Sequence, residues 1–508
     1  MAATENPSPS PDQLQDYRAK RSVEQTPEPA GTVSRAPGHL YVFHQHAARR
    51  LHWDLRLELN GVLLSWAVPK GPSPNPNDKR LAVHVESHPI EYGDFEGTIP
   101  EGNYGAGAVI LWDRGVWVPI GDPEEGLAKG KLLFELRGYK CKGVWTLVKL
   151  KKEEKEWLLI KERDAYAVWE ETEYPAGSVL SGLTVEQLGE GADSGEPIRE
   201  ALERQGVPRT PVEPAAVDIM LAENRARPFS KPGWVFELKL DGYRIIAGLR
   251  DGRVTLLTRN GNDVTGSFPE IAKAIGALPF DGLVLDGELI GLDDRGRPSF
   301  QRLQQRAKIT RPLEVKKASL EAPTTYFAFD LLGFEDFDLR SMPLVERKRV
   351  LRQVLPEVGA VPYVEHFEDE GEALFERVRG LRLEGVVGKK ADGPYRGGRS
   401  ADWVKVRADQ VDDFVVVGFS APKGSRAGFG ALHLADYVDG ELTYAGRVGS
   451  GFSGEELEEV REQLERHVRQ DATPPCGGPV PTGGDHTWVD PELMCEVRYK
   501  EWTGEGLL

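Results

Sequence analysis

The hydrophobic pattern changes character along the chain, and this change constrains the fold more than any other feature. From about Leu40 to Ile160, short apolar and aromatic runs are separated by Gly, Pro and Asn, which is typical of strands joined by turns. From about Pro214 such runs alternate with helical patterns, which favours an α/β or α+β domain. Beyond Val411 strands return, interrupted by one helix that opens with the capping pattern Ser453-Gly454-Glu455-Glu456. A single hydrophobic core rarely grows beyond about 300 residues, so a chain of 508 residues is expected to form two or three domains.

Two stretches of different composition precede or separate these regions. Residues 1–35 are rich in Pro, Ser, Gln and Glu without apolar periodicity, which predicts a flexible N-terminal arm, and a part of this arm could still clasp the first domain. Residues 167–213 carry many Glu, Gly and Pro and few large apolar residues, which predicts a solvated linker with one possible short helix. The domains expected around them are a mostly β-barrel domain over residues 36–166, an α+β domain over 214–411 and a small β-barrel over 412–508.

Composition excludes several classes of protein. The three cysteines, Cys141, Cys476 and Cys495, are widely spaced, which argues against a disulfide framework and for a reducing compartment. The N-terminus lacks the basic start and apolar core of a signal peptide, and no apolar run approaches membrane-spanning length, so we expect a cytoplasmic protein without a membrane partner. The net charge of −17 argues against general affinity for nucleic acid. Contacts with phosphate are therefore expected at local basic clusters such as Arg49-Arg50 and Lys389-Lys390.

Lys239 lies at the end of one strand predicted in the second domain. The run from Gly233 to Leu240 alternates apolar and polar residues, and the turn signal Asp241-Gly242 ends it. Burial and a neighbouring cation such as Arg244, or a bound metal, can lower the pKa of a lysine amine and make it a nucleophile towards phosphorus. A Lys-x-Asp-Gly turn is also an ordinary hairpin tip, so these residues alone leave both interpretations open.

Five further motifs follow in the second domain. They are Thr258-Arg259-Asn260-Gly261, Asp286-Gly287-Glu288-Leu289, Phe327-Ala328-Phe329-Asp330, Glu384-Gly385-Val386-Val387-Gly388-Lys389 and Trp403-Val404-Lys405-Val406-Arg407. Together with Lys239 they supply a nucleophilic amine, two separated carboxylates, an aromatic face and several cations, which phosphoryl chemistry on a nucleotide requires. Singly, Glu288 could be a surface residue, Phe329 ordinary core and Lys389-Lys390 a solvated pair. Their joint occurrence at the ends of predicted strands favours function.

This ordered set resembles the covalent nucleotidyltransferase superfamily, and its motifs are similar to those of ATP-dependent DNA ligases from about Pro214 onwards. The resemblance implies an ATP-grasp-like adenylation domain followed by an OB-fold. It implies that Lys239 attacks the α-phosphate of ATP, expels pyrophosphate and holds AMP. The remaining implied roles are adenine-edge contact by Glu237, adenine stacking by Phe329, ribose and nick-phosphate binding by Arg244 and Arg259, Mg²⁺ binding by Glu288 and Glu384, and charge neutralisation at the α-phosphate by Lys389 and Lys405.

Histidines cluster in the first domain, where four of the ten lie in His44-Gln45-His46, at His52 and at His88. In a strand, His52, Asp54 and Arg56 point to one face, so an imidazole, a carboxylate and a guanidinium converge. Neutral imidazole with carboxylate suits Mn²⁺ or Zn²⁺, and Arg can bind a phosphoryl oxygen pair. The pattern His-x-Asp-x-Arg can equally be a surface ion-pair ladder, so from these residues alone both interpretations remain open.

Four motifs of this domain resemble the 3′-phosphoesterase domain of bacterial ligase D. They are the run from His46 to Arg56, Trp66-Ala67-Val68-Pro69-Lys70-Gly71, His88-Pro89-Ile90-Glu91-Tyr92 and Glu101-Gly102-Asn103-Tyr104-Gly105-Ala106-Gly107. The resemblance implies a domain that trims a terminal ribonucleotide and then removes the remaining 3′ phosphate. The implied roles are manganese binding by His46, His52 and Asp54, catalysis by Arg56 and His88, and phosphate binding by Arg21, Glu28, Lys70, Arg80 and Tyr92.

The sequence therefore predicts a bifunctional enzyme of non-homologous end joining, with a Mn²⁺-dependent 3′-phosphoesterase and an ATP- and Mg²⁺-dependent DNA ligase. Its expected partners are DNA ends and nicks, including 3′-ribonucleotide termini, Ku, and a separate polymerase or primase, since no polymerase domain is recognised. The expected location is the cytoplasm, at the nucleoid. The chain ends at Leu508 before the Arg-x-Pro segment of the family, so we expect a truncated OB-fold domain. The alternatives are a DNA-end-binding scaffold with phosphoesterase activity but defective self-adenylylation, and an RNA ligase or guanylyltransferase-type enzyme.

Overall fold

The computed structural model forms two compact units. The first comprises residues 1–221, 240–365 and 389–402, and the second comprises 222–239, 366–388 and 403–508. The structure describes residues 13–21, 26–29, 33, 38–151, 153–170, 172–191, 193–293, 298–381, 383–408, 410–422, 428–471, 473–482, 485–499, 502 and 506–508. No helix among these residues is both long and apolar enough to cross a membrane.

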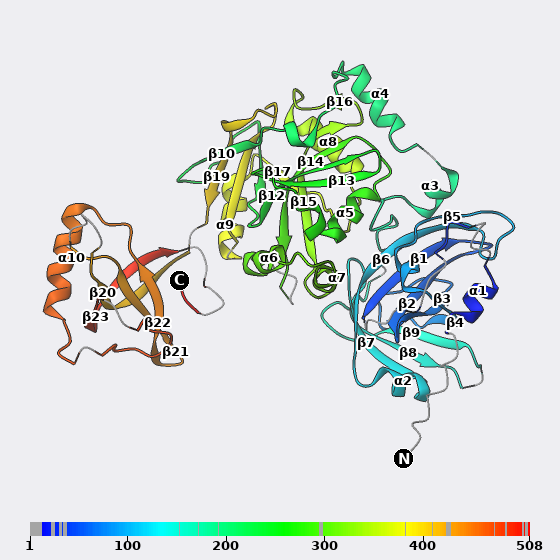
Figure 1. Ribbon diagram of the computed structural model, residues 1–508, viewed down its shortest axis with the longest axis horizontal. Coiled ribbons are helices and arrows are strands. Elements are labelled where there is room, and N and C mark those ends of the chain that lie inside the picture. The colour runs from blue at the N-terminus through cyan, green and yellow to red at the C-terminus, as the bar shows by residue number, and fades with distance from the viewer. Residues whose placement is uncertain are drawn as a thin grey trace, which may run out of the picture. The chain divides into compact units, whose positions relative to one another are not determined.

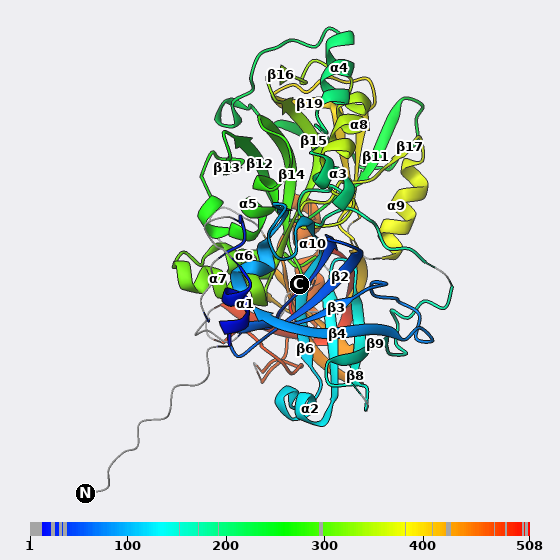
Figure 2. The ribbon, with the colours of Figure 1, turned by 90° about the vertical axis from the view of Figure 1, so that its right-hand side faces the viewer.

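The N-terminal domain is a closed antiparallel sheet (Figure 1). Its strand order is β1-β2-β3-β4-β9-β8-β7-β6-β5, and β1 also pairs with β6, which closes the barrel. The strands are β1 (Leu40–Ala47), β2 (Leu51–Leu59), β3 (Val62–Val68), β4 (Arg80–His88), β5 (Gly97–Ile99), β6 (Gly107–Pro119), β7 (Lys131–Gly138), β8 (Lys142–Lys149) and β9 (Glu156–Lys161). Figure 2 shows β2, β3, β4 and β9 following one another around it. The 3₁₀ turn η1 (Ile90–Asp94) follows β4, and helix α2 (Pro123–Lys129) joins β6 to β7.

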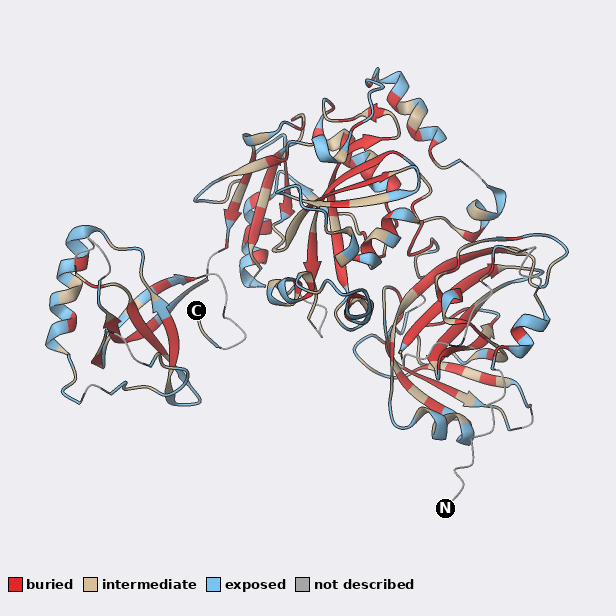
Figure 3. Ribbon diagram, viewed as in Figure 1, coloured by how far each residue is buried: buried red, intermediate tan, exposed pale blue. Residues whose placement is uncertain are grey.

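Aromatic side chains fill the barrel, because alternate residues of each strand point inward. The largest of those fully buried are Trp66, Trp117 and Trp145. Buried residues run along the strands, and exposed residues dominate the helix surfaces (Figure 3). This domain confirms the predicted mostly β-barrel fold.

We expected a flexible arm over residues 1–35, with the possibility that a part of it clasps the first domain. The described part of this arm packs on the barrel. Helix α1 (Gln15–Ala19) buries Tyr17, whose ring contacts the rings of His88 and Tyr92. The Tyr17 hydroxyl donates a hydrogen bond to the carbonyl of Pro29, at 2.7 Å. One buried aromatic thus anchors a segment whose overall composition is typical of mobile chain.

The stretch 167–213 also contains more structure than the solvated linker with one possible helix that we expected. It forms two helices, α3 (Val185–Glu190) and α4 (Glu196–Arg204). The buried residues of these helices are Val185 of α3 and the pair Ile198 and Leu202 of α4. Four residues apart on a helix, Ile198 and Leu202 share one face, so sparse apolar residues suffice to dock it.

The next domain is built on two sheets and confirms the predicted α+β class. The sheet of the first unit has the order β13-β12-β14-β15-β16. Its strands are β12 (Tyr243–Arg250), β13 (Arg253–Thr258), β14 (Leu283–Gly291), β15 (Thr324–Phe334) and β16 (Phe337–Asp338). Helices of this region are η2 (Pro214–Ala216), η3 (Thr265–Ser267), α5 (Pro269–Gly276), α6 (Phe300–Ala307), α7 (Pro312–Glu321) and α8 (Leu344–Val354).

The other sheet has the order β10-β19-β18-β11-β17. Its strands are β10 (Met220–Asn224), β11 (Trp234–Leu238), β17 (His366–Glu368), β18 (Gly385–Lys390) and β19 (Gly398–Arg407). Helix α9 (Gly371–Gly380) contributes Leu374, Phe375 and Val378 to a buried cluster with Phe236 and Val386 of the sheet. The apolar face of α9 therefore packs on β11 and β18.

The C-terminal domain is a four-stranded sheet with the order β22-β21-β20-β23, consistent with the predicted OB-fold. Its strands are β20 (Gln410–Ser420), β21 (Leu432–Val438), β22 (Glu441–Val448) and β23 (His486–Tyr499). Helix α10 (Gly454–Arg466) begins with the expected capping box, in which Ser453 and Glu456 exchange hydrogen bonds.

Two buried carboxylates face each other in the first unit. Asp286 of β14 and Asp330 of β15 are register partners, and neither is exposed to solvent. Arg347 of α8, also fully buried, donates from Nε and Nη2 to the two oxygens of Asp330, both at 2.8 Å. Like charges directly opposite on a sheet repel, so each carboxylate needs its own cation.

Replacing Arg347 with Met should lower the local free energy of unfolding by about 3–5 kcal/mol, because Asp330 would remain buried without its counter-ion. Hydrogen exchange of β15 and α8 peptides in urea measures this loss. The matched control is Arg340→Met, since Arg340 makes the same two-bond pair with the partly exposed Asp338. Breaking that pair should cost at most about 1 kcal/mol. Equal losses in the two variants would contradict the prediction.

Candidate metal centre and nucleotide-binding residues

Three donors for a metal ion meet in the barrel. The antiparallel pairing of β1 and β2 places His46 opposite His52. Asp54 lies two residues after His52, hence on the same face. One donor atom from each of His46, His52 and Asp54 can be chosen so that all three lie within 4.8 Å of one another. The strand pattern predicted the common face of His52 and Asp54, and the register of β1 with β2 adds His46.

Hydrogen bonds to backbone carbonyls orient both imidazoles. His46 Nε2 lies 2.8 Å from the carbonyl oxygen of Gly105, and His52 Nδ1 lies 2.9 Å from that of Arg50. A neutral imidazole that donates through these nitrogens presents a lone pair on the other nitrogen, as metal-binding histidines do. Burial lowers the pKa of His46, which favours this neutral form. Two imidazoles and a carboxylate therefore fit a divalent transition metal.

Arg56 is the most extensively bonded residue beside this cluster. Its guanidinium donates to Asp54 Oδ2 at 2.9 Å, to Ser65 Oγ at 2.8 Å and to His44 Nδ1 at 3.2 Å. Arg56 Nη1 also lies 2.8 Å from His88 Nδ1. With several of its donors engaged, the buried guanidinium is held in one orientation beside the metal ligands. The sequence did not single out Ser65, because a serine in a strand carries no signal of its own.

Arg21 reaches the same cluster from the N-terminal segment. It donates from Nε to Glu28 at 2.8 Å and from Nη1 to Glu86 at 3.2 Å, and its Nη2 lies 3.1 Å from His88 Nε2. Burial, followed by the charges of Arg56 and Arg21, holds the pKa of His88 well below its usual range. Glu86 is a second residue that sequence reasoning missed.

Tyr92 also lies beside Arg56, whereas Lys70 and Arg80, two predicted phosphate-binding residues, are not joined to the metal donors within the described residues. The Arg56 guanidinium is 4.8 Å from the centre of the Tyr92 ring, and burial raises the Tyr92 pKa. Arg80 instead donates to Asp78, at 3.0 Å. Over the part of the chain that the structure describes, no hydrogen bond or ion pair joins Lys70 or Arg80 to the three metal donors, so their phosphate-binding role stays a prediction.

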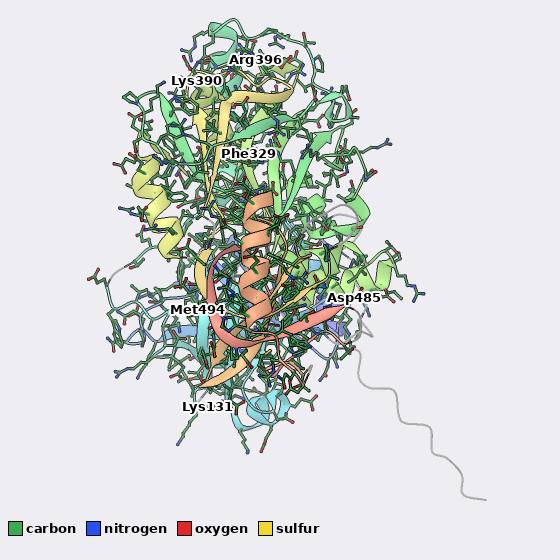
Figure 4. All side chains as sticks on the ribbon, turned by 90° about the vertical axis from the view of Figure 1, so that its left-hand side faces the viewer. Lys131, Phe329, Lys390, Arg396, Asp485 and Met494 are labelled. Carbon is green, nitrogen blue, oxygen red and sulfur yellow. The ribbon has the colours of Figure 1, made fainter. Side chains whose placement is uncertain are left out.

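In the first unit, two cations lie close to the ring of Phe329, which is labelled in Figure 4. The Arg244 guanidinium is 4.4 Å and the Lys389 amine 4.2 Å from the centre of its ring. Asp286 accepts from Arg244 at 2.5 and 2.7 Å and from the Tyr395 hydroxyl at 2.6 Å, which fixes the guanidinium. The buried Phe329 ring therefore has positive charge beside it, a combination that suits a nucleotide.

Two more predicted residues of the first unit are placed by its sheet. Glu288 is opposite Arg244 in the pairing of β12 with β14, so both lie on one face. Arg259 is exposed in the turn that follows β13. Arg244, Glu288 and Phe329 thus lie on the neighbouring strands β12, β14 and β15. Lys389 approaches Phe329 from β18 of the other sheet, and Arg259 is at the surface.

In the second unit, the Lys239 amine forms an ion pair with the carboxylate of Glu384. The backbone fixes this pair, because the Lys239 amide donates to the carbonyl of Gly385 at 2.9 Å. Glu237, two residues before Lys239 on β11, is buried and pairs in register with His366. Lys405 lies on β19, where its carbonyl accepts from the Arg225 amide at 3.0 Å.

Models of three known domain families match this chain. Models of the DNA ligase D 3′-phosphoesterase domain, the ATP-dependent DNA ligase domain and the ATP-dependent DNA ligase C-terminal region match residues 44–149, 217–407 and 425–508. The multifunctional non-homologous end joining protein LigD of Pseudomonas aeruginosa is 41% identical over 98% of this chain. The chain belongs to the bacterial ligase D family. The Mycobacterium tuberculosis member, a multifunctional non-homologous end joining DNA repair protein, is 32% identical over 99% of this chain.

The chain spans about 60% of the length of these ligase D relatives, 60% for the first and 59% for the second. Among solved structures, mycobacterial DNA ligase D complexed with ATP and MES is 32% identical, with a TM-score of 0.37 over 58% of this chain and 93% of that one. The match to the phosphoesterase model begins at residue 44, so it includes the three metal donors and lies beyond Arg21 and Glu28.

His88 should titrate only at a pH well below 6.5 in NMR spectra of selectively labelled, metal-free protein, because burial and the charges of Arg56 and Arg21 lower its pKa. Arg21→Gln should raise that pKa by removing one of the two cations that disfavour the imidazolium. His433 of the C-terminal domain is the control within the same spectra. Burial lowers its pKa to about 4, and Arg21 does not contribute to this shift, so the substitution should leave it unchanged. A His88 resonance that titrates near pH 6.5 in the unmodified protein would be incompatible with this environment.

Proposed function

We propose that this chain is a bifunctional DNA end-repair enzyme of non-homologous end joining. Its barrel removes 3′-terminal ribonucleotides and 3′ phosphates, and its adenylation and OB-fold domains seal nicks with ATP. The observation that carries the proposal is the presence of two chemically distinct groups in one ligase D chain. The first is a metal-donor set beside a fixed guanidinium, and the second is a strand-end lysine paired with a carboxylate.

The phosphoesterase reaction would use manganese held by His46, His52 and Asp54. A divalent ion bound there lowers the pKa of a bound water and polarises a phosphoryl oxygen. Arg56, oriented by Asp54 and Ser65, would stabilise the negative charge that develops on the phosphoryl oxygens. Arg21 would add a second fixed charge.

His88 would accept a proton in the reaction, and Tyr92 would donate a hydrogen bond. His88 is neutral at physiological pH, since its pKa is lowered, and so can take up a proton. The Tyr92 hydroxyl stays protonated, since its pKa is raised, and can donate a hydrogen bond to the phosphate. Lys70, Arg80 and Glu28 are assigned to phosphate binding through the family resemblance.

Replacing His52 with Ala should abolish Mn²⁺-dependent release of a 3′ phosphate from DNA, because one of three metal donors is lost. Sealing of clean nicks by the same variant should continue. The matched control is His84→Ala, a histidine of the same barrel that contacts Trp66. Loss of both activities in the His52 variant would argue against separate modules.

The ligase reaction would begin when the Lys239 amine attacks the α-phosphate of ATP. The new nitrogen–phosphorus bond forms as the bond to pyrophosphate breaks, and AMP remains on the lysine. Phe329 would stack on the adenine and Glu237 would contact its edge. Arg244 and Arg259 would bind the ribose and the nick phosphate, and Lys389 and Lys405 would neutralise the α-phosphate.

Glu288 and Glu384 would bind Mg²⁺, which prefers oxygen ligands. In the structure Glu384 pairs with Lys239. If Glu384 held the metal ion, it would have to give up this ion pair, which would free the Lys239 amine.

Incubation of the full chain with ATP and Mg²⁺ should add the mass of one AMP, and Lys239→Ala should eliminate the adduct. Lys231→Ala is the control, because Lys231 is an exposed lysine of the loop before β11. An adduct that survives in the Lys239 variant would make another residue the nucleophile. No adduct in the unmodified chain would favour the scaffold alternative, and an adduct formed from GTP instead of ATP would favour a guanylyltransferase-type enzyme.

We also propose that the protein acts on DNA ends and nicks, including 3′-ribonucleotide termini, in the cytoplasm at the nucleoid. Ku and a separate polymerase or primase are the proposed partners. These proposals are supported by the relatives in Pseudomonas aeruginosa and Mycobacterium tuberculosis, which are named as non-homologous end joining proteins.

A further inference from the structure

Tyr104 lies on the loop that contacts the metal centre, between β5 and β6 (Figure 1). The next residue, Gly105, presents its carbonyl oxygen to His46 Nε2 at 2.8 Å. Although it is aromatic and adjacent to this contact, Tyr104 is 53% exposed. A single exposed aromatic is common on protein surfaces, so the neighbours of the ring decide whether it has a role.

Two cations lie beside the Tyr104 ring. Lys20 Nζ is 5.1 Å and the Arg21 guanidinium 5.6 Å from the ring centre, both within cation–π range. The same Arg21 lies 3.1 Å from His88. Tyr104 is therefore connected, through one side chain, to the residues proposed to bind the phosphate.

Glycines hold the Tyr104 loop in place. Gly105 and Gly107 have positive φ angles of 75° and 139°. A Cβ on Gly107 would lie 2.1 Å from the carbonyl oxygen of Ala47 on β1, so the backbone can approach that strand only with glycine there. The Ala106 amide donates to the carbonyl of Asn103 at 3.2 Å and closes a turn around Tyr104. The backbone of the loop thus positions the exposed Tyr104 ring, although the ring itself is not buried.

We propose that Tyr104 binds the nucleobase of the 3′-terminal nucleotide by stacking, and so favours removal of a nucleoside over removal of a bare phosphate. This inference rests on the proposed phosphoesterase function. In the first step, a water oxygen attacks phosphorus and the bond from phosphorus to O5′ of the terminal nucleoside breaks. The nucleoside leaves with a proton on O5′, and the DNA keeps a 3′ phosphate.

In the second step, water attacks the phosphorus of that 3′ phosphate and the bond to O3′ breaks. Inorganic phosphate leaves and O3′ takes a proton. The terminal base is present only in the first step, so stacking on Tyr104 lowers the barrier of that step alone. An aromatic side chain stacks on any base, because every base has a π-face. The site therefore takes a terminal nucleoside without preference for one base.

The test compares three DNA ends with the full chain and Mn²⁺: a terminal ribonucleoside, the same end with an abasic ribose, and a 3′ phosphate. Tyr104→Ala should lower the ratio of nucleoside release to phosphate release by about tenfold or more, as loss of one base stack does. Tyr104→Trp should restore the ratio. On the abasic end, Tyr104→Ala and the unmodified chain should give the same ratio.

The matched control is Tyr166→Ala, which removes a tyrosine of similar exposure, 54%, from the segment after β9 of the same domain. This control substitution should change neither the rate of nucleoside release nor the rate of phosphate release. An unchanged ratio in Tyr104→Ala, an equal loss of both activities, or an equal loss on the abasic end would overturn the inference and leave the proposed function standing. An unmodified chain that releases neither nucleoside nor phosphate would overturn the proposed function and this inference with it.

Discussion

The opposition of Asp286 and Asp330 is the constraint on which the nucleotidyltransferase sheet of the first unit depends. The two buried carboxylates face each other across β14 and β15, and each is compensated by its own guanidinium, from Arg244 and from Arg347. A buried charge without its partner costs several kcal/mol, so the sheet and the positions of both arginines are coupled. One consequence is functional, because the pairing that neutralises Asp286 also holds Arg244 against Phe329.

The barrel also contains a buried arginine that hydrogen bonds hold in place. Arg56 is buried and bonded to Asp54, Ser65 and His44, and it lies within 2.8 Å of His88. Burial, followed by the Arg56 charge, holds the pKa of His88 well below its usual range. In the proposed mechanism the Arg56 charge stays available to the phosphate. In the proposed mechanisms, both halves of the enzyme would use a fixed guanidinium to bind phosphate, and preorganised charge of this kind stabilises a transition state.

The sequence predicted much of this arrangement, but unevenly. Period-two alternation was enough to put His52, Asp54 and Arg56 on one face, and motif order was enough to select Lys239 and Phe329. The sequence did not predict a role for Ser65 or Glu86, because serine and glutamate are common on strands. Only their hydrogen bonds to Arg56 and Arg21 indicate a role. Helix α4 was underestimated because two buried residues, Ile198 and Leu202, give a weak apolar signal within an acidic stretch.

By itself the sequence determined the class of each domain, the identity of the chemical groups and their order, since these follow from local periodicity and from residue type. Tertiary structure decided which groups meet. The register of β1 with β2 placed His46 opposite His52, and the folding of α1 onto the barrel carried Arg21 to His88 across 67 positions of sequence. Such contacts depend on burial and strand pairing between distant segments, and a local pattern contains no information about either.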